Sequence, residues 1–377
     1  MRADIFCRVV DNYGDIGVCW RLARRLAHGL GWTVRLWVDD LAPFARIEPG
    51  VHAQAARQAV QGVEVVHWTR PAPDLEPGDA VIEAFACDPP PTFVARMAES
   101  RPVWVNLEYL SAEDWIESCH GLPSPQAGGL IKHFFFPGFT AATGGLLREP
   151  GLIAERDAWR ADRARQDAFL AGLGLPAGAL QAWRDGARLH TLFCYPHAPA
   201  AELADALAGA PIDALAGPEL PPALLLAPQG VAPGLAEGRR GRAWIARIPF
   251  LTQPGYDRLL WTAEANFVRG EDSFVRALWA GRPLVWQIYP QDEDAHLDKL
   301  AAWLDRYEAP PPVRELFMAW NAAPGAAPVA RALAGALAGP AWPDWTAHAD
   351  ARAREAASRP DLADALAAFI LRQARTG

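Results

Sequence analysis

Lysine is almost absent from this chain of 377 residues, since only Lys132 and Lys299 among its 36 basic side chains are lysine. The arginines that make up the rest are scattered and form no basic run, and the net charge at pH 7 is −8. This bias indicates a GC-rich genome rather than a phosphate-binding surface. Binding to nucleic acid or to an anionic membrane surface is therefore not expected.

Cysteine is also scarce, and no two cysteines have a C-x-x-C spacing: the five are Cys7, Cys19, Cys87, Cys119 and Cys194. Their odd number and wide scatter argue against a disulfide framework and favour a reduced, cytoplasmic protein. No run of about 18 uncharged apolar residues occurs, and the apolar run near the N-terminus is too short for a signal peptide. The sequence thus predicts neither export nor a membrane span.

Several catalytic motifs are missing as well. The chain has no H-E-x-x-H or H-x-H, no G-x-S-x-G and no G-x-x-x-x-G-K-[ST], which argues against a dedicated metal site, a serine hydrolase and a P-loop. The spacing Gly14-x-x-Gly17 is not G-x-G-x-x-G, and no acidic residue near position 35 clearly marks a ribose site. A dinucleotide-binding fingerprint is therefore absent.

What the chain does contain is two series of strand-like runs that alternate with helical segments. Within the first 110 residues, β-branched and aromatic runs at 5–10, 33–38, 63–68, 80–85 and 102–107 predict a parallel sheet with crossover helices. The alternation restarts at Arg188 and continues to about residue 289, so a second doubly wound domain is expected. A polar helical stretch at 152–176 resembles a connector, and 349–375 predicts terminal helices interrupted near Pro360.

Tandem α/β domains place the expected ligand cleft between them, at the carboxyl ends of both sheets. Asp11 and Asp15 lie where the first strand pattern becomes helical, in VVDNYGDIGVCW. Two interpretations of Asp15 remain open. It is either an N-cap in a turn eased by Gly14 and Gly17, or a functional carboxylate that helix-end amides hold ionised with a low pKa.

A second candidate site is the segment NFVRGEDSFVRALW, where a strand runs into a helix. Ser273 and the free amides of the helix start suit a diphosphate, and Arg269 adds positive charge. Glu271 and Asp272 would repel a phosphate, so they suit hydroxyl groups, the reacting centre or a simple helix cap. Two acidic patterns are weak candidates for a metal site: the D-x-D of Asp292 and Asp294, and the pair at 39–40. The D-x-D is better explained as the acidic start of a helix.

A third candidate is aromatic. Phe193, Tyr195 and Tyr256 lie near segment ends of the second domain, where they suit stacking on a base, although aromatic side chains more often belong to the core. Gln253 lies close enough in sequence to Tyr256 to read the edge of such a base.

Together these segments carry a specific resemblance. The blocks DNYGDIGVCWRLARRL, VNLEYLSAEDWIESCHGLPS, KHFFFPGFT, LFCY and NFVRGEDSFVRALWAGRPLVWQIYPQ occur in order between residue 9 and about residue 300. They resemble the EarP family, protein-arginine rhamnosyltransferases that modify bacterial elongation factor P. Any one block is a weak signal, but five in order are a strong one.

The resemblance implies a GT-B fold, an α/β architecture in which two Rossmann-like domains face a central cleft. The expected boundaries are 1–150 for an N-terminal acceptor-binding domain, 151–180 for a connector and 181–345 for a C-terminal nucleotide-sugar-binding domain. Terminal helices at 346–377 are expected to pack back on the N-terminal domain.

The resemblance also implies an inverting transfer of L-rhamnose from dTDP-β-L-rhamnose to an arginine of elongation factor P, without a metal or other cofactor. In the family, the aspartate of the NYGDIG loop is the catalytic carboxylate and falls on Asp15, while an earlier aspartate needed for activity falls on Asp11. Glu271 is the third candidate catalytic residue. The candidate donor-binding residues are Asn12, Tyr13, Gly14, Gly17, Phe193, Tyr195, Gln253, Tyr256, Arg269, Gly270, Asp272 and Ser273. Family members commonly have phenylalanine where this sequence has Tyr256, and stacking should survive that change.

Two other functions are compatible with the same pattern. A GT-B transferase with a lipid or small-molecule acceptor would need a basic, apolar face on the first domain, which the sequence does not clearly show. A non-catalytic nucleotide-sugar-binding protein would bind the donor without turnover, and the presence of Asp11, Asp15 and Glu271 argues against it.

Overall fold

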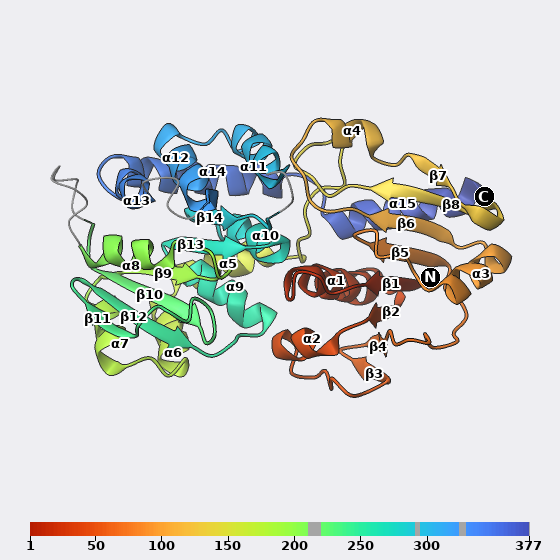
Figure 1. The fold of residues 1–377 in the computed structure, drawn as a ribbon, viewed down its shortest axis with the longest axis horizontal. Helices are drawn as coiled ribbons and strands as arrows, with labels where there is room; N and C mark the ends of the chain where they lie inside the picture. The colour runs from red at the N-terminus through yellow and green to blue at the C-terminus, as the bar shows by residue number, and fades with distance from the viewer. Residues whose placement is uncertain (210–219, 291–294, 324–328, 377) are drawn as a thin grey trace. The chain divides into compact units, whose positions relative to one another are not determined.

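The computed structural model describes residues 1–209, 220–290, 295–323 and 329–376. The chain divides into two compact units, which are coloured along the chain in Figure 1. Unit 1 comprises Met1–Pro150 together with Ser358–Gly377, and unit 2 comprises Gly151–Ala357. Each unit is an α/β fold around its own sheet, as the alternation of strand and helix patterns predicts.

The sheet of unit 1 has eight strands in the residues described: β1 (Arg2–Cys7), β2 (Thr33–Val38), β3 (Arg57–Val60), β4 (Val63–His67), β5 (Ala80–Ala84), β6 (Val103–Leu107), β7 (Pro123–Pro125) and β8 (Ile131–Phe135). Their order is β3-β4-β2-β1-β5-β6-β8-β7. The pairs from β4 to β8 are parallel, and β3 and β7 add antiparallel edges. The central strands are buried on both faces, which explains their continuous apolar runs.

The helical elements of unit 1 are α1 (Gly14–Arg24), a π-helical turn η1 (Arg25–Gly29), α2 (Leu41–Ile47), α3 (Pro91–Ser100), α4 (Trp115–Cys119), a 3₁₀ turn η2 (Ala127–Gly129) and α15 (Leu362–Thr376). Helix α1 buries Ile16, Cys19, Trp20 and Ala23 on one face, as their helical spacing predicts.

Unit 2 repeats the arrangement in the residues described, with β9 (Arg188–Leu192), β10 (Ala223–Pro228), β11 (Gly238–Arg240), β12 (Ala243–Ile248), β13 (Ala265–Arg269) and β14 (Leu284–Gln287). The strand order is β11-β12-β10-β9-β13-β14, and only the β11 edge pairs antiparallel. Its helices are α5 (Leu152–Ala161), α6 (Arg163–Gly172), α7 (Ala177–Arg184), α8 (Ala200–Ala208), α9 (Gln253–Thr262), α10 (Glu271–Ala280), α11 (Ala295–Arg306), α12 (Pro311–Asn321), α13 (Val329–Leu337) and α14 (Ala341–Ala357).

In both sheets, the direction in which successive strands are added reverses beside the first strand, which is β1 in unit 1 and β9 in unit 2. In unit 1 the chain moves outward from β1 through β2 to β4 and then returns to place β5 on the other side of β1. In unit 2 it moves from β9 through β10 to β12 and returns to place β13 beside β9. Ligands of open α/β sheets bind outside the carboxyl ends of the strands at such a reversal. The segments after β1 and β5, and those after β9 and β13, are therefore where a site is expected.

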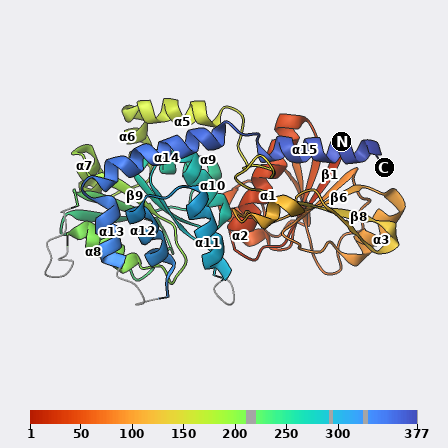
Figure 2. The ribbon, with the colours of Figure 1, turned by 90° about the horizontal axis from the view of Figure 1, so that it is seen from above.

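The last helix of the chain packs on unit 1. Arg25, the first residue of η1, contacts Asp361 at 3.1 Å and Asp364 at 2.7 Å. Phe369 of α15 lies edge-on to Phe135, with ring centroids 5.5 Å apart. Figure 2 shows α15 running along this unit. The last helix is thus an integral part of the first unit.

The segments around the expected domain boundaries belong to unit 2. The polar stretch expected as a connector forms α5 and α6, and Arg160 of α5 contacts Asp350 of α14 at 3.5 Å (Figure 2). The boundary expected at residue 346 falls inside α14, whose buried Trp345 and Ala349 pack within unit 2. The chain returns to unit 1 at Ser358, because the break at Pro360 lies between α14 and α15.

Candidate active site

Asp15 lies in the first turn of α1 and its side chain folds back over the loop that precedes the helix. Its Oδ2 accepts hydrogen bonds from the backbone amides of Val10 and Asp11, each at 2.8 Å. The side chain is only 3% exposed. The carboxylate thus closes the segment after β1, on one side of the reversal in strand order.

The structure corrects two expectations about Asp15. The N-cap of α1 is Tyr13, and no side chain caps the helix there, so Asp15 is not the cap. The expected low pKa is also wrong in direction. Burial raises the pKa of the Asp15 carboxyl above its ordinary value, and the Asp11 and Val10 amides oppose that effect only in part. The first turn directs this side chain back toward the N-terminus, away from the solvent that would stabilise its charge.

The other predicted loop residues lie around the same turn. Gly14 donates to the Asp11 carbonyl at 2.7 Å and Gly17 to the Tyr13 carbonyl at 3.0 Å, which starts the helix. A Cβ on Gly14 would lie 2.6 Å from Asp11 Oδ2, so only glycine allows the Asp11 carboxylate to approach the helix start. Asn12 has a φ of 38°, a left-handed conformation that asparagine tolerates better than most residues.

The acidic pair at 39–40 holds the neighbouring loop instead of forming a metal site. Asp39 Oδ1 accepts from the Val9 amide at 2.8 Å, and Asp40 caps α2 by accepting from the Ala42 amide at 2.9 Å. The Asp39 charge also raises the pKa of Asp15, although burial is the larger cause. Three successive amides after β1, those of Val9, Val10 and Asp11, are therefore bound by carboxylates.

On the other side of the reversal, the segment after β5 is strained. Phe85, Ala86 and Asp88 have φ values of 58°, 52° and 52°, which cost non-glycine residues roughly 1–2 kcal/mol each. Strain of this kind persists only where the surroundings impose it, and it gathers at functional sites. No signal in the sequence marked this segment, because none of its residues is glycine.

Tyr109 is a second residue that sequence reasoning missed. It follows β6 and stacks on Phe85 with ring centroids 4.3 Å apart and planes 12° apart. It also offsets part of the rise in the pKa of the Asp15 carboxyl that burial causes. It lies within the block VNLEYLSAEDW that carries the family resemblance, and that was the only signal available.

In unit 2, Phe193 and Tyr195 follow β9, and the Arg269 guanidinium at the end of β13 lies over both rings. Its Cζ is 4.8 Å from the centroid of Phe193 and 4.5 Å from that of Tyr195. Three predicted donor-binding residues thus meet at the reversal of the second sheet. An aromatic surface beside a fixed guanidinium suits a base joined to a phosphate.

Three further residues complete this cluster. Phe250 lies edge-on to Phe193 at 6.0 Å between centroids, and Tyr289 lies edge-on to Tyr195 at 5.7 Å. Gln287, fully buried at the end of β14, accepts a hydrogen bond from the Tyr195 amide at 2.7 Å. Sequence reasoning did not predict these three residues as part of the site. The only signal for them was their position after a strand or at its end, and aromatic side chains at such positions more often belong to the core.

The start of α10 has the features expected of an anion site. Gly270 precedes the helix with φ 61° and ψ −167°, a conformation that is essentially restricted to glycine. Its carbonyl accepts from Trp286 Nε1 at 2.8 Å, and no side chain caps the helix. Ser273 is buried in the first turn, whereas Glu271 and Asp272 are half-buried. The first amides of a helix attract anions.

A buried ion pair joins the middle of α10 to α9. Asp257 Oδ1 and Oδ2 accept from Arg276 Nε and Nη2, each at 2.8 Å, and both residues are almost completely buried. Gln253 and Tyr256 lie in the first turn of α9, so the pair fixes them relative to Ser273. Burial raises the pKa of Tyr256, while Ser273 lowers it in part, so the hydroxyl stays protonated at neutral pH.

The structure therefore gathers the predicted residues into two sets. Asp11, Asn12, Tyr13, Gly14, Asp15 and Gly17 form one set in unit 1, and Phe193, Tyr195, Gln253, Tyr256, Arg269, Gly270, Glu271, Asp272 and Ser273 form the other in unit 2. Asp292 and Asp294 lie outside the described residues. Among the residues described, no group of three or more His, Cys, Asp and Glu side chains is arranged to hold a metal ion. Nor does any helix in this part of the chain have the length and apolarity to cross a membrane.

Comparisons with known proteins give a consistent result. A family model described as elongation factor P (EF-P) rhamnosyltransferase EarP matches residues 3–371. A protein-arginine rhamnosyltransferase of Pseudomonas putida is 46% identical over 387 residues, covering 97% of both chains. Another from Neisseria meningitidis is 40% identical over 314 residues, covering 80% of this chain and 78% of the relative.

Solved structures agree with the sequence relatives. A structure that describes EarP-mediated arginine glycosylation of translation elongation factor EF-P is 34% identical, has a TM-score of 0.63 and covers 98% of each chain. The calicheamicin glycosyltransferase CalG4, 16% identical with a TM-score of 0.51 over 99% of each chain, shares the fold. The GT-B fold predicted from the sequence is thereby confirmed.

Proposed function

The chain belongs to the EarP family and is a glycosyltransferase of the protein-arginine rhamnosyltransferase type, and we propose that it transfers L-rhamnose from dTDP-β-L-rhamnose to an arginine of elongation factor P. In this proposal unit 1 supplies the carboxylate that acts on the acceptor, and unit 2 binds the nucleotide. No metal or other cofactor takes part.

The observation that carries the proposal is the Asp15 carboxylate, buried after β1 and held by two backbone amides. A guanidinium has a pKa above about 12 and a delocalised lone pair, so it is a poor nucleophile at neutral pH. A fixed carboxylate orients one nitrogen and accepts its proton as the new bond forms. Because burial raises the pKa of Asp15, this carboxylate is a stronger base than an exposed aspartate.

In the proposed reaction the guanidinium nitrogen attacks the anomeric carbon on the face opposite the leaving group. The carbon–nitrogen bond forms, the bond from that carbon to the diphosphate oxygen breaks, and dTDP leaves with the electron pair. The nitrogen gives up its proton to Asp15, and the configuration at the anomeric carbon is inverted. Asp11, whose carboxylate lies against Gly14 at the same turn, is proposed to help hold the guanidinium.

Unit 2 supports the proposed donor in three ways. Phe193, Tyr195 and Tyr256 offer aromatic surface for the base, and Gln253 offers an amide for its edge. Arg269 and the first amides of α10, with the Ser273 hydroxyl, stabilise the negative charge of the departing diphosphate. We assign Glu271 and Asp272 to sugar hydroxyls, because carboxylates beside a diphosphate would repel it.

Asn12, Tyr13, Gly14 and Gly17 were named from the sequence as donor-binding residues. They shape the turn around Asp15, and a donor-binding role for them stays a prediction. Residues 1–150 carry 13 basic and 18 acidic side chains, a mildly acidic balance that suits an arginine-bearing acceptor.

The test is the intact mass of elongation factor P after incubation with the protein and dTDP-rhamnose. The proposal predicts a gain of one deoxyhexose, and no gain when the acceptor arginine is replaced by lysine or the donor is omitted. Donor hydrolysis or transfer to a lipid extract without any gain on elongation factor P would favour another acceptor. Donor binding without turnover, with both substrates verified, would favour a binding protein instead.

A further inference from the structure

Gln287 is the last residue of β14, and its side chain is fully buried. Its Oε1 accepts a hydrogen bond from the Tyr195 backbone amide at 2.7 Å. Because a backbone amide only donates, the end of the side chain that faces it is the oxygen, and the other end is the nitrogen. Within the part of the chain that the structure describes, Gln287 Nε2 has no hydrogen-bond partner. The oxygen of this buried amide is thus paired, whereas its nitrogen is not.

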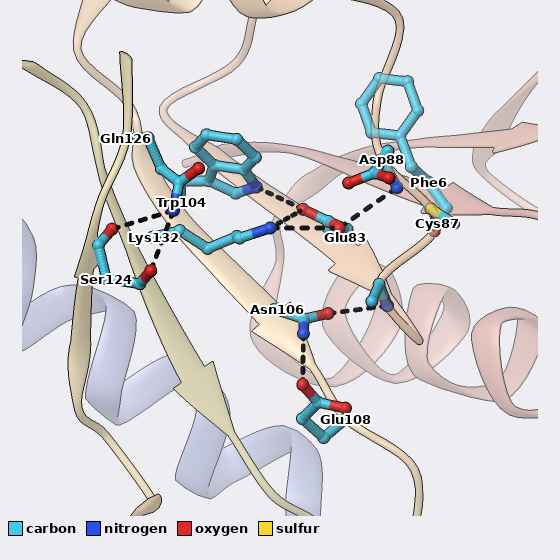
Figure 3. Close-up of polar contacts among 11 residues, drawn as sticks. Phe6, Glu83, Cys87, Asp88, Trp104, Asn106, Glu108, Ser124, Gln126 and Lys132 are labelled. Atoms are coloured by element: carbon cyan, nitrogen blue, oxygen red, sulfur yellow. Dashed lines mark hydrogen bonds and ion pairs between the residues drawn. The ribbon is translucent and has the colours of Figure 1, made fainter. Parts of the chain in front are cut away.

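In three other buried amide side chains the nitrogen does have an acceptor. Asn106 Nδ2 donates to Glu108 at 2.5 Å in unit 1, as Figure 3 shows. In unit 2, Asn266 Nδ2 and Gln166 Nε2 donate to backbone carbonyls at 3.1 and 2.9 Å. A buried donor without an acceptor is destabilising, because it has lost its hydrogen bonds to water and gained none in return. The nitrogen of Gln287 is therefore suited to an acceptor on a bound ligand.

The end of β14 lies next to the residues of unit 2 that were predicted to bind phosphate. Strands β13 and β14 are parallel, and Arg269 is the register partner of Gln287. Both residues contact Tyr195, since the Arg269 Cζ lies 4.5 Å from the centroid of its ring and Gln287 binds its amide. Trp286, the residue before Gln287, donates its Nε1 to the Gly270 carbonyl at 2.8 Å and so fixes the start of α10. Gln287 is thus placed between the guanidinium and the helix start.

The charges around this position favour an anionic acceptor over a sugar hydroxyl. The Arg269 guanidinium is positive, and the first amides of α10, which no side chain caps, carry partial positive charge. An oxygen of a diphosphate only accepts hydrogen bonds, so it can satisfy the guanidinium, the helix amides and the Gln287 nitrogen together. Sugar hydroxyls are suited instead to the carboxylates Glu271 and Asp272, which accept the hydrogen bonds that hydroxyls donate.

We propose that Gln287 is a donor-binding residue whose Oε1 holds the Tyr195 backbone and whose Nε2 donates to an oxygen of the diphosphate that Arg269 and α10 bind. This inference deepens the proposed function, because it rests on unit 2 binding the nucleotide donor. The two ends of one side chain then have separate tasks. The oxygen places the aromatic ring for the base, and the nitrogen contributes to the affinity for the diphosphate.

Two variants separate these tasks. Gln287→Glu keeps an oxygen for the Tyr195 amide and replaces the nitrogen by a carboxylate oxygen, whereas Gln287→Met keeps the length and removes both groups. In Gln287→Met, the Kd for dTDP measured by isothermal titration calorimetry should rise roughly 10- to 100-fold, because a hydrogen bond to a charged group is lost. In Gln287→Glu it should rise at least as much, because the carboxylate repels the diphosphate. A wild-type Kd for dTDP in Gln287→Glu would overturn the inference.

Thymidine, which has no phosphate, distinguishes a contact with the diphosphate from the placement of Tyr195. Its Kd, measured by ligand-observed NMR, should match the wild type in Gln287→Glu, because the Tyr195 amide keeps its acceptor. A role restricted to holding Tyr195 predicts that Gln287→Glu keeps its affinity for both ligands and that Gln287→Met loses the same factor for both. That pattern would overturn the assignment of Nε2 to the diphosphate.

Gln166→Glu is the matched control, since it makes the same change in a buried amide of unit 2 whose nitrogen donates to the Trp159 carbonyl. Its Kd for dTDP should equal that of the wild type, and an equal loss in Gln166→Glu and Gln287→Glu would overturn the inference. The melting temperature of each variant without ligand reports on folding. If Gln287→Glu does not fold, Gln287→Met decides: a larger loss for dTDP than for thymidine supports the inference, and equal losses overturn it.

These measurements need neither turnover nor elongation factor P, so they separate the inference from the proposed function. The expected pattern of dTDP binding without any rhamnose transfer by the wild type would count against the proposed function alone. Rhamnose transfer by the wild type, with unaltered dTDP binding in both Gln287 variants, would count against the inference alone. A wild type that does not bind dTDP would overturn both.

Discussion

Unit 1 and unit 2 have the same strand order around their first strand, yet the side chains at the carboxyl end of that strand differ. They are carboxylates in unit 1, and aromatic rings beside a guanidinium in unit 2. After β1, the amides of Val9, Val10 and Asp11 are bound by the carboxylates of Asp39 and Asp15. After β9, two aromatic rings lie under the guanidinium of Arg269. The fold decides where the loops gather, and the side chains decide which substrate each loop set suits.

The difference separates two tasks. Carboxylates suit a cationic guanidinium acceptor, whereas aromatic rings with a guanidinium and helix amides suit a nucleoside diphosphate. Changes in unit 2 should therefore alter donor binding, and changes at Asp15 should alter the chemical step. The predictions below run from the largest expected effect to the smallest.

The largest effect is expected from Asp257→Ala in unit 2, which leaves Arg276 buried without its bidentate partner. We expect a loss of about 3–5 kcal/mol in the free energy of unfolding, measured with a chemical denaturant. Asp305→Ala removes the exposed partner of Arg314 in the same unit and should cost less than about 1 kcal/mol. Equal losses in the two variants would show that the buried pair does not hold unit 2 together.

Arg269→Gln should weaken dTDP binding by roughly 10- to 100-fold, because it removes a charged donor worth about 1.5–3 kcal/mol. Isothermal titration calorimetry with dTDP measures the change. Arg163→Gln is the matched control, since Arg163 lies over the ring of Trp183 in the same unit, away from the predicted donor residues. An unchanged Kd in Arg269→Gln would contradict the assignment of the donor to this edge.

The buried His190 should make the free energy of unfolding of unit 2 fall as the pH drops. Burial lowers the pKa of this histidine to about 3, whereas in the unfolded chain it is about 6.5. The unfolded state then binds the proton more readily, so stability is full above about pH 6.5 and falls as the pH drops toward 3. At pH 5 the loss is about 2 kcal/mol, measurable by denaturant unfolding at pH 7 and pH 5.

His190→Leu is the control for that measurement. It removes the titrating group while keeping a buried side chain of similar size in β9. Its unfolding free energy should change less between pH 7 and pH 5 than that of the wild type. A pH dependence identical to that of the wild type would assign the acid sensitivity to other groups.

The smallest effect is expected in unit 1. Because burial raises the folded-state pKa of Asp15, its ionised form is unfavourable in the folded protein, and the penalty grows as the pH rises through that pKa. Asp15→Asn should therefore be as stable as the wild type at neutral pH, or slightly more stable. The difference should vanish toward about pH 4, where both states of the wild type are protonated. A clear loss of stability in Asp15→Asn at neutral pH would show that the carboxylate is structural.

Much of the architecture follows from local patterns in the sequence. The parallel strands of both sheets other than β8, and the break near Pro360, are where the apolar runs and proline predict them. The strand β8 lies beyond the first 110 residues in which the strand runs of the first domain were predicted. The antiparallel edges β3, β7 and β11 were not predicted, since they are only three or four residues long and all their residues except the buried Val60 are half-exposed or exposed.

The site was predicted less completely, for physical reasons. The position of Asp15 follows from the strand-to-helix transition, but its hydrogen bonds to Val10 and Asp11 depend on where the helix begins. Its raised pKa depends on burial, which local sequence does not reveal. The contact of Phe85 with Tyr109 joins the ends of two strands, and no periodicity encodes such a pairing.

The division of labour between the units is tested most directly by single-turnover transfer with Asp15→Asn at saturating dTDP-rhamnose. The account predicts that the rate of rhamnose transfer to elongation factor P falls by about 10²- to 10⁴-fold, while the Kd for dTDP stays at the wild-type value. A near-normal transfer rate, or a lost rate explained by lost dTDP binding, would contradict it.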